Sequence, residues 1–170
     1  MNIPELETER LDMRGWRESD LEPLSAFYAD EGSCRFLGGT KPRDMVWRAL
    51  ATYVGHWELR GYGFWVLEEK ATGDFAGWCG PWFPEGWPEP EIGWGLMPAA
   101  RGKGYATEAA KRAREHAYGE LGWTTAISFI APENNASRAV AERLGATLEK
   151  ETILMGHPAN IFRHPAPHEI

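Results

Sequence analysis

Cysteine is scarce in this chain, with only Cys34 and Cys79 among 170 residues. The two lie far apart and in no metal-ligand spacing, which excludes a disulfide scaffold and a cysteine metal site. We therefore expect two free, buried thiols in a reducing compartment. Apolar runs of membrane-spanning length are also missing, and the acidic N-terminal segment MNIPELETERLDM lacks the apolar core of a signal peptide. These absences predict a cytoplasmic protein with no membrane partner.

Positive charge is in deficit, because 18 Lys and Arg face 25 Asp and Glu for a net charge of −7. A general nucleic-acid binder needs a basic face, so we expect no nucleic-acid partner. The acidic balance is compatible with a cationic or amine-bearing partner, although a solvated acidic surface is the simpler explanation. None of the five histidines forms a metal pair, so no metal is expected. A Gly-x-Ser-x-Gly elbow is missing as well, which argues against a serine hydrolase.

What the chain does have is alternating strand-like and helix-like segments, typical of a mixed α/β fold in one domain over residues 1–170. The strand-like runs are 8–16, 63–69, 74–80, 91–97, 124–130, 147–155 and 159–164. The helix-like runs are 18–30, 41–61, 104–119 and 134–145. A capping box of Ser19 and Glu22 is expected to open the first helix, and a turn at GHP to join the last two strands. Residues 164–170 are expected to be a loose tail.

The stretch MPAARGKGYATE, residues 97–108, places two glycines and two cations where an apolar strand gives way to a helix. A helix N-terminus presents unpaired N–H groups and a partial positive charge, so it attracts anions. Gly102 and Gly104 remove Cβ atoms where a phosphate must approach the backbone, and Arg101 and Lys103 add charge. This pattern favours a pyrophosphate cradle. An ordinary strand-to-helix turn with solvated cations is the alternative that the turn alone leaves open.

Two common nucleotide-binding motifs do not match the residues of this turn. The Walker pattern needs Ser or Thr after Gly-Lys, and here Gly104 follows Lys103; the dinucleotide pattern needs a third glycine where Thr107 stands. RGKGYA instead resembles the Arg/Gln-x-x-Gly-x-Gly/Ala pyrophosphate loop of the GNAT acyltransferase superfamily. TERL, GYGFWVL, TGDFAGWCG, EIGWGLMP, GYATEAA and PENNAS…AERLGA follow in the order of its RimJ/RimL branch of ribosomal-protein N-terminal acetyltransferases. The resemblance covers nearly the whole chain.

The resemblance implies a single-domain GNAT-like fold, with a mostly antiparallel, twisted sheet that splays at the cofactor site and about four flanking helices. It implies an acetyl-CoA-dependent N-acetyltransferase. The acetyl group passes to a primary amine, of a protein N-terminus or a small molecule, by direct attack in a ternary complex. A homodimer is implied by the habit of the superfamily alone. The alternatives are a non-catalytic CoA-binding module and an acyltransferase that uses a different acyl-CoA.

The same resemblance implies the cofactor contacts. Backbone N–H groups from Gly102 to Thr107 would hold the pyrophosphate, and the backbone near Leu96 would pair with the pantetheine arm. Asn134 would lie near the pantetheine or its thiol. The residues implied in binding acetyl-CoA are Leu96, Met97, Arg101, Gly102, Lys103, Gly104, Tyr105, Ala106, Thr107 and Asn134.

Acetyl transfer to an amine also needs proton movements, because an alkylamine with a pKa of about 10 arrives protonated. Glu91 is our candidate base, against the alternative of an exposed strand-end carboxylate. Ser137 is our candidate acid, against the alternative of a helix-capping hydroxyl. Many members of the superfamily place a tyrosine where this chain has Ala141, which leaves Ser137 or water as the proton donor. Glu108 is interpreted as a first-turn carboxylate favoured by the helix dipole.

The tryptophan-rich region around residues 78–94 is expected to border the acceptor side. Most of these rings are expected to be core residues or loop anchors. Trp82, Trp87 and Trp94 are candidates to wall the acceptor pocket or to stack on a cation. Glu85 and Glu89 in the same loop would suit a cationic acceptor. Gly93 and Gly95 inside a strand indicate a bulge or a close approach by another group.

Overall fold

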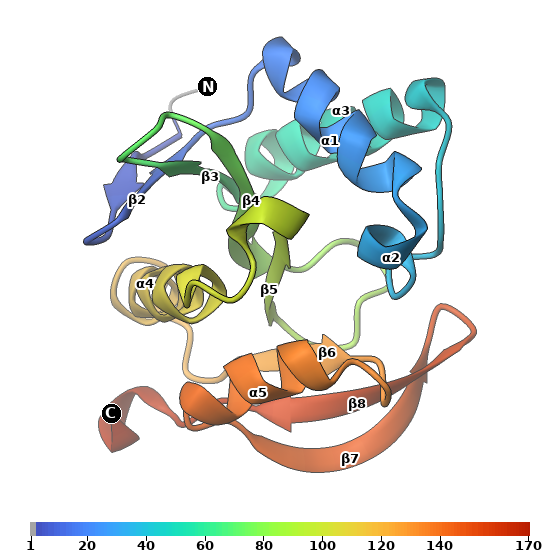
Figure 1. The fold of residues 1–170 in the computed structure, drawn as a ribbon. Coiled ribbons are helices and arrows are strands. Elements are labelled where there is room, and N and C mark those ends of the chain that lie inside the picture. Colours follow the sequence, from blue (N-terminus) through green and yellow to red (C-terminus); the bar gives the residue numbers. More distant parts are fainter. Residues whose placement is uncertain (1–2) are drawn as a thin grey trace.

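An eight-stranded sheet, ordered β1-β2-β3-β4-β5-β6-β8-β7, runs through the computed structural model, which describes residues 3–170 (Figure 1). The pair β5–β6 is parallel and the other neighbouring pairs are antiparallel. The strands are β1 Leu6–Glu7, β2 Leu11–Arg14, β3 Trp65–Glu69, β4 Phe75–Trp82, β5 Glu91–Leu96, β6 Ile127–Ile130, β7 Thr147–Leu154 and β8 His157–Arg163. This mixed α/β arrangement confirms the predicted fold class.

The helices divide between the two faces of the sheet. They are α1 Leu21–Ala29, α2 Glu31–Cys34, α3 Arg43–Arg60, α4 Tyr105–Gly119 and α5 Asn135–Arg143, with short 3-10 turns at Glu18–Asp20, Pro98–Ala100 and Pro167–Glu169. Helices α1 and α3 pack through one aromatic-rich core, α4 packs through a second core, and α5 packs on β6 and β8 (Figure 1). The four-residue α2 was not expected.

The cores explain the residue choice of the helices. Helix α4 buries a stripe of small side chains, which lets its axis lie close to β4 and β5; these are Ala106, Ala109, Ala110, Ala113 and Ala117. Helix α3 buries Val46, Leu50, Tyr53 and Trp57, as its apolar spacing predicts. Cys34 and Cys79 are free and buried, as expected.

The glycines of β5 make room for aromatic rings of the protein itself. A Cβ on Gly93 would lie 3.0 Å from the Phe64 ring, and one on Gly95 would lie 2.4 Å from the Trp78 indole. The contact at Gly95 is too short for a real side chain, and the contact at Gly93 would require the Phe64 ring to shift by a few tenths of an ångström. The expected close approach is therefore made by Phe64 and Trp78, which belong to the core that α1 and α3 cover.

Three local expectations are wrong, and a fourth is shifted. Glu22 pairs with Arg43 rather than capping α1, and the Asp20 carboxylate accepts the Arg17 N–H of the preceding 3-10 turn at 2.7 Å. The expected strand over residues 8–16 is shorter and spans only Leu11–Arg14, after a bend at residues 9–10. The last hairpin turns at Met155–Gly156, so only Gly156 of the expected GHP turn lies in it. His164, the first residue of the expected loose tail, is buried. None of the helices within residues 3–170 has both the length and the apolar character required to cross a bilayer.

Candidate active site

The turn between β5 and α4 is shaped by two glycines with left-handed backbones. Gly102 has φ 74° and Gly104 has φ 84°, and α4 begins at the next residue, Tyr105. Such φ values cost most other residues about 1–2 kcal/mol. Within residues 3–170, the backbone N–H groups of residues 102–107 donate no hydrogen bond to a protein acceptor. Those of Tyr105, Ala106 and Thr107 lie in the first turn of the 15-residue α4, at its positive end, where an anion such as a pyrophosphate would fit.

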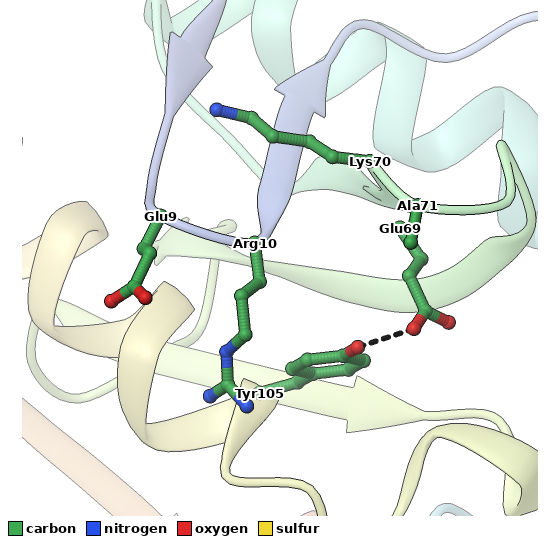
Figure 2. Close-up of a pocket in the computed structure, with 6 residues that line it drawn as sticks. All are labelled: Glu9, Arg10, Glu69, Lys70, Ala71 and Tyr105. Atoms are coloured by element: carbon green, nitrogen blue, oxygen red, sulfur yellow. Dashed lines mark hydrogen bonds between the residues drawn. The ribbon is translucent and has the colours of Figure 1, made fainter.

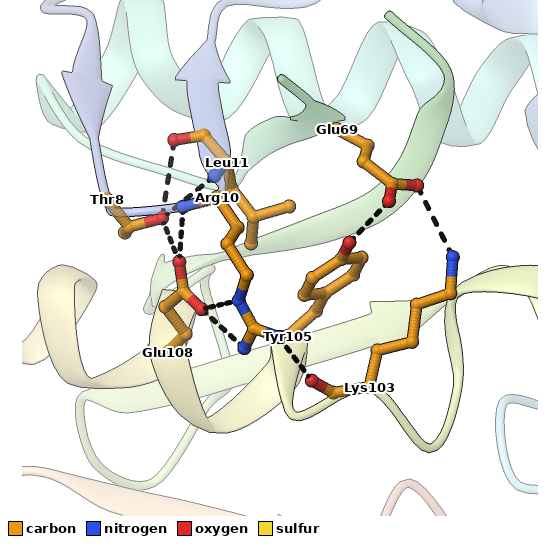
Figure 3. A network of polar contacts seen from close by, with 7 residues as sticks. All are labelled: Thr8, Arg10, Leu11, Glu69, Lys103, Tyr105 and Glu108. Carbon is orange, nitrogen blue, oxygen red and sulfur yellow. Dashed lines mark hydrogen bonds and ion pairs between the residues drawn. The ribbon is translucent and has the colours of Figure 1, made fainter. Parts of the chain in front are cut away.

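A polar network fixes the back of this turn to the β1–β2 corner (Figure 3). Arg10 Nη1 donates to the Lys103 carbonyl at 2.8 Å, and its Nε donates to Glu108 at 2.8 Å. Glu108 also accepts from the Thr8 hydroxyl at 2.6 Å and from the Arg10 N–H at 2.8 Å. Glu108 is therefore a first-turn carboxylate that anchors the turn, as interpreted from the sequence. Thr8 and Arg10 were not singled out, because nothing in the sequence near them points to a contact a hundred residues away.

The two cations of the turn already have partners within the protein. The Arg101 guanidinium donates to the Leu96 carbonyl at 3.1–3.2 Å, and Lys103 Nζ lies 3.5 Å from Glu69, which also accepts from the Tyr105 hydroxyl. A pocket of about 370 Å³ lies on this side of Tyr105, lined by Glu9, Arg10, Glu69, Lys70, Ala71 and Tyr105 (Figure 2). Its two acidic and two basic side chains balance. The N–H groups of the turn are therefore the stronger feature for an anion.

The sheet splays beside this turn. Glu91↔Ile127 is the single register pair between β5 and β6 within the described chain. Ile92 faces Pro81, which has no N–H, so the polar groups of Ile92 cannot form a rung with β4 and point toward β6. By alternation, the N–H and C=O groups of Trp94 and Leu96 also point into the gap. Apart from the Leu96 carbonyl, which accepts from Arg101, they form an open strand edge that fits an extended amide chain such as pantetheine.

Two of the residues implied in cofactor binding are engaged elsewhere. The Met97 N–H donates to the Ala76 carbonyl of β4 at 2.9 Å, so it faces away from the gap. The Asn134 side chain accepts from the Ser137 N–H at 3.2 Å and caps α5. Ala106 is buried under the first turn of α4, and the buried Thr107 hydroxyl has no partner in the described chain.

Glu91 begins β5 at the point where the splay opens, and its side chain is only 8% exposed. Oε2 accepts from Trp87 Nε1 at 2.8 Å, and Oε1 accepts from the Phe129 N–H at 3.1 Å. Burial raises the pKa of this carboxyl to about 7, and the two hydrogen bonds act in the opposite direction. The alternative of an exposed strand-end carboxylate is therefore wrong. A buried carboxyl that titrates near neutrality is suited to accept a proton from an amine.

Ser137 lies in the first turn of α5 and contacts β5 through Trp94. Trp94 Nε1 lies 3.2 Å from Ser137 Oγ, and indole nitrogen can only donate. The serine oxygen thus acts as acceptor, and its own proton is left free for another partner. Trp94 also packs against the cluster that contains the fully buried Ala141.

The other aromatic candidates differ in exposure. Trp82 is buried and stacked between His56 and Phe64, so its position is that of a core residue. Trp87 is half-buried, with its ring edge-on to Phe129 and its nitrogen on Glu91. Trp87 therefore lies directly beside the candidate base.

Glu89 is engaged within the protein rather than free for a cationic acceptor. Arg163 of β8 binds both Glu89 oxygens, at 3.0 and 2.8 Å, and also pairs with Glu149 of β7 at 2.6 Å. Glu85 is fully exposed, 3.6 Å from Arg60. Across residues 3–170, no three His, Cys, Asp or Glu side chains are grouped so that they could hold a metal ion.

A splayed sheet, an open strand edge and a helix N-terminus with unpaired N–H groups lie together at β5, and this combination fits a protein that binds an acyl-CoA. The comparisons with known proteins give the family. The model of the acetyltransferase (GNAT) domain matches residues 10–147, so the chain belongs to the GNAT acetyltransferase family. It is an acetyl-CoA-dependent N-acetyltransferase, as predicted.

Three similar proteins illustrate the relationship. The uncharacterized protein YkkB of Bacillus subtilis (strain 168) is 30% identical over 165 residues, which cover 92% of this chain and 93% of YkkB. An acetyltransferase crystal structure from Agrobacterium tumefaciens str. C58 has 31% identity and a TM-score of 0.88, with 97% and 96% coverage. The ribosomal L7/L12 alpha-N-protein acetyltransferase RimL, solved with coenzyme A, has 17% identity and a TM-score of 0.75, with 95% and 97% coverage, and shares the fold.

Proposed function

We propose that this protein transfers the acetyl group of acetyl-CoA directly to a primary amine, of a protein N-terminus or a small molecule, and that Glu91 is the base. One observation carries the assignment of the base: Glu91 is a buried carboxyl with a pKa near 7 at the mouth of the splay, on the strand that leads into the anion-binding turn. An amine bound there must lose a proton before it attacks, and a carboxylate with this pKa accepts protons at neutral pH.

The N–H groups of residues 102–107 would hold the pyrophosphate, while Trp94 and Leu96 would pair the backbone groups that point into the gap with the pantetheine arm. Arg101 would have to release the Leu96 carbonyl when this arm binds. Acetyl-CoA supplies an acyl group that is already activated as a thioester, so no covalent enzyme intermediate is needed. The residues contribute position and proton transfer, and position alone can supply much of the acceleration.

The amine nitrogen attacks the thioester carbon, the C–S bond breaks, and the thiolate requires a proton. Ser137 would donate that proton, because its oxygen accepts the Trp94 N–H and its own hydrogen is free. Trp87 would border the acceptor beside Glu91, whereas the buried Trp82 would shape the pocket from behind. Residues 1–170 would act as one catalytic domain.

The RimJ/RimL-like branch is our proposal for the placement of the chain within the family. Its support is the order of the matching segments along the sequence, together with the fold shared with RimL over 95% of the chain. The acceptor class that this placement favours is a protein N-terminus, with small amines as the alternative. We further propose that the protein acts in the cytoplasm.

The test is release of the CoA thiol from acetyl-CoA in the presence of short peptides with different N-termini, amino acids, polyamines and aminoglycosides, each against a blank without amine. Release with peptides alone would support the RimJ/RimL-like proposal, and release with polyamines alone would overturn it. Binding of acetyl-CoA without release on any amine would refute the direct-transfer proposal. Propionyl- and succinyl-CoA in parallel test the acyl preference.

A further inference from the structure

The first missing rung between β5 and β6 is replaced by two side chains. The Ile127 N–H donates to the Pro90 carbonyl at 3.0 Å, as a regular parallel ladder requires. The next rung would join the Phe129 N–H to the Ile92 carbonyl. Instead, the Phe129 N–H donates to Glu91 Oε1 at 3.1 Å, and the Ile92 carbonyl accepts from Ser128 Oγ at 2.6 Å. Both halves of the rung are satisfied, and the strands are free to separate.

Ser128 is held in place by a buried chain of polar groups. His164 Nε2 lies 2.9 Å from Ser128 Oγ, and Arg114 Nη1 lies 3.2 Å from His164 Nδ1 and 2.7 Å from the Leu144 carbonyl. The three side chains are 1%, 2% and 5% exposed for Ser128, His164 and Arg114. They come from β6, the end of β8 and α4, and they meet behind the splay.

The direction of each hydrogen bond from Arg114 through His164 to Ser128 follows from the donor at one end and the carbonyl acceptor at the other. Arginine only donates, so His164 Nδ1 accepts and Nε2 carries the proton. Nε2 then donates to Ser128 Oγ, whose proton goes to the Ile92 carbonyl. Burial and the nearby Arg114 and Arg163 charges lower the pKa of His164 to about 3, which keeps the imidazole neutral and preserves this direction at ordinary pH.

We infer that Ser128, His164 and Arg114 are positioning residues that hold the splay between β5 and β6 open and leave the Phe129 N–H to orient Glu91. The role in orienting Glu91 rests on the proposed function of Glu91 as base; the role in the splay does not. Burying three polar groups in the core is costly unless each bond is made, and apolar residues would fill the same space at lower cost. Their position at the first missing rung between β5 and β6 provides a reason for keeping these polar groups in the core.

Removal of the serine hydroxyl should let the rung form. In S128A the Ile92 carbonyl loses its donor, and the Phe129 N–H is the group that a regular parallel ladder would pair with it. That exchange draws the strands together and takes one hydrogen bond from Glu91. We expect acetyl-CoA to bind at least about fivefold more weakly, and the acidic limb of the kcat/KM pH profile to move upward by about half a unit or more, because the carboxylate loses a stabilising N–H.

The experiment measures acetyl-CoA affinity by calorimetry, the pH profile by thiol release and thermal stability, for S128A and for the matched control S25A. Ser25 Oγ on α1 is buried without a partner in the described chain, so S25A makes the same change away from the rung. We expect S25A to match the unmodified protein. An S128A variant that is less stable, but has unchanged affinity and an unchanged acidic limb, would overturn the inference.

A second pair of variants covers the case in which S128A does not fold. Gln at position 164 can accept from Arg114 and donate to Ser128, whereas Leu can do neither. H164Q should therefore restore most of the affinity and pH profile that H164L loses, and equal loss in both would contradict the inference. Calorimetry needs no turnover, so weaker binding in S128A with an unmoved acidic limb would confirm the role in the splay and reject Glu91 as the titrating base.

Discussion

Replacement of Glu91 by glutamine should reduce turnover and, at the same time, abolish a pH-dependent loss of stability. The folded-state pKa of Glu91 is about 7, against an ordinary value of 4.5. Because the folded-state value is the higher one, the contribution of this group to stability is full below pH 4.5 and is lost as pH rises through 7. The difference of about 2.5 units corresponds to roughly 3 kcal/mol, at about 1.36 kcal/mol per unit.

The E91Q substitution also changes stability independently of pH, because Glu91 accepts two hydrogen bonds. Trp87 Nε1 and the Phe129 N–H donate to different oxygens of the carboxylate, and glutamine has only one oxygen to offer. One buried donor is then unsatisfied in E91Q, at a cost of about 1–3 kcal/mol at every pH. This cost lowers the free energy of unfolding of E91Q by the same amount at every pH. Ionisation of Glu91 instead changes how the free energy of unfolding of the unmodified protein depends on pH.

Urea unfolding at pH 5 and pH 8 measures that slope. Relative to E91Q, the unmodified protein should lose about 2–3 kcal/mol of unfolding free energy between these two pH values. Equal losses in the two proteins would refute the assignment of a raised pKa to Glu91. E115Q, on the exposed face of α4, is the matched control and should behave as the unmodified protein.

The kinetic half of the same prediction uses thiol release. The kcat/KM of the unmodified protein should fall about tenfold per pH unit below about pH 7, and E91Q should be slower by about 10²–10⁴ at pH 8 without that limb. E91Q turnover within twofold of the unmodified rate would remove Glu91 as the base, whatever its effect on stability.

Three further substitutions test the cofactor turn, the acid and the loop. G104A places a side chain at φ 84°, with a Cβ 3.3 Å from Arg10, and should weaken acetyl-CoA binding tenfold or more in calorimetry. G119A, whose Cβ would have nothing within 4 Å, is the control and should bind normally. Equal affinities in the two variants would contradict pyrophosphate binding by the turn. W94F keeps an aromatic ring but removes the N–H that donates to Ser137, so kcat should fall about threefold or more while acetyl-CoA affinity is retained. An unchanged kcat would mean that Trp94 does not orient Ser137 for proton donation. In R163M, Glu89 and Glu149 lose their shared partner, so the free energy of unfolding in urea should fall by about 1–3 kcal/mol. The loop that carries Glu89 should also lose its anchor, and the KM for the amine should rise several-fold. An unchanged KM would mean that other contacts hold this loop.

The backbone conformation of the turn between β5 and α4 was predictable because its causes are local. Two glycines between an apolar strand and an alanine-rich helix specify the left-handed φ values of Gly102 and Gly104 and the start of α4 at Tyr105. The long helices and strands were predictable for the same reason, since their apolar periodicity depends only on residues that are close in sequence. The position of Glu91 followed from the resemblance, but its burial did not.

Contacts across the fold were not predictable. The local spacing of Ser19 and Glu22 fits a capping box for α1, yet α1 has no side-chain cap. The Asp20 carboxylate instead accepts the Arg17 N–H of the preceding 3-10 turn and binds the buried Arg14 of β2 at 2.8 Å, a contact across the fold. Ser128 offered one sign, a small polar residue in the apolar run TTAISFI. Its partners His164 and Arg114 lie 36 and 14 residues away and carry no pattern that joins them.

The departure at position 141 has a structural reason in this chain. Ala141 is fully buried in the cluster that Trp94 packs against, so the indole of Trp94 occupies space beside the position where many members of the superfamily carry a tyrosine. Ser137 lies one turn before Ala141 on the same face of α5, within reach of the indole nitrogen at 3.2 Å. Because Ala141 is fully buried, a tyrosine at this position would need space that the neighbouring side chains of the cluster now occupy. The large residue on β5 and the small residue on α5 are consistent with each other, and they support our proposal that the proton donor is the serine hydroxyl rather than a phenol.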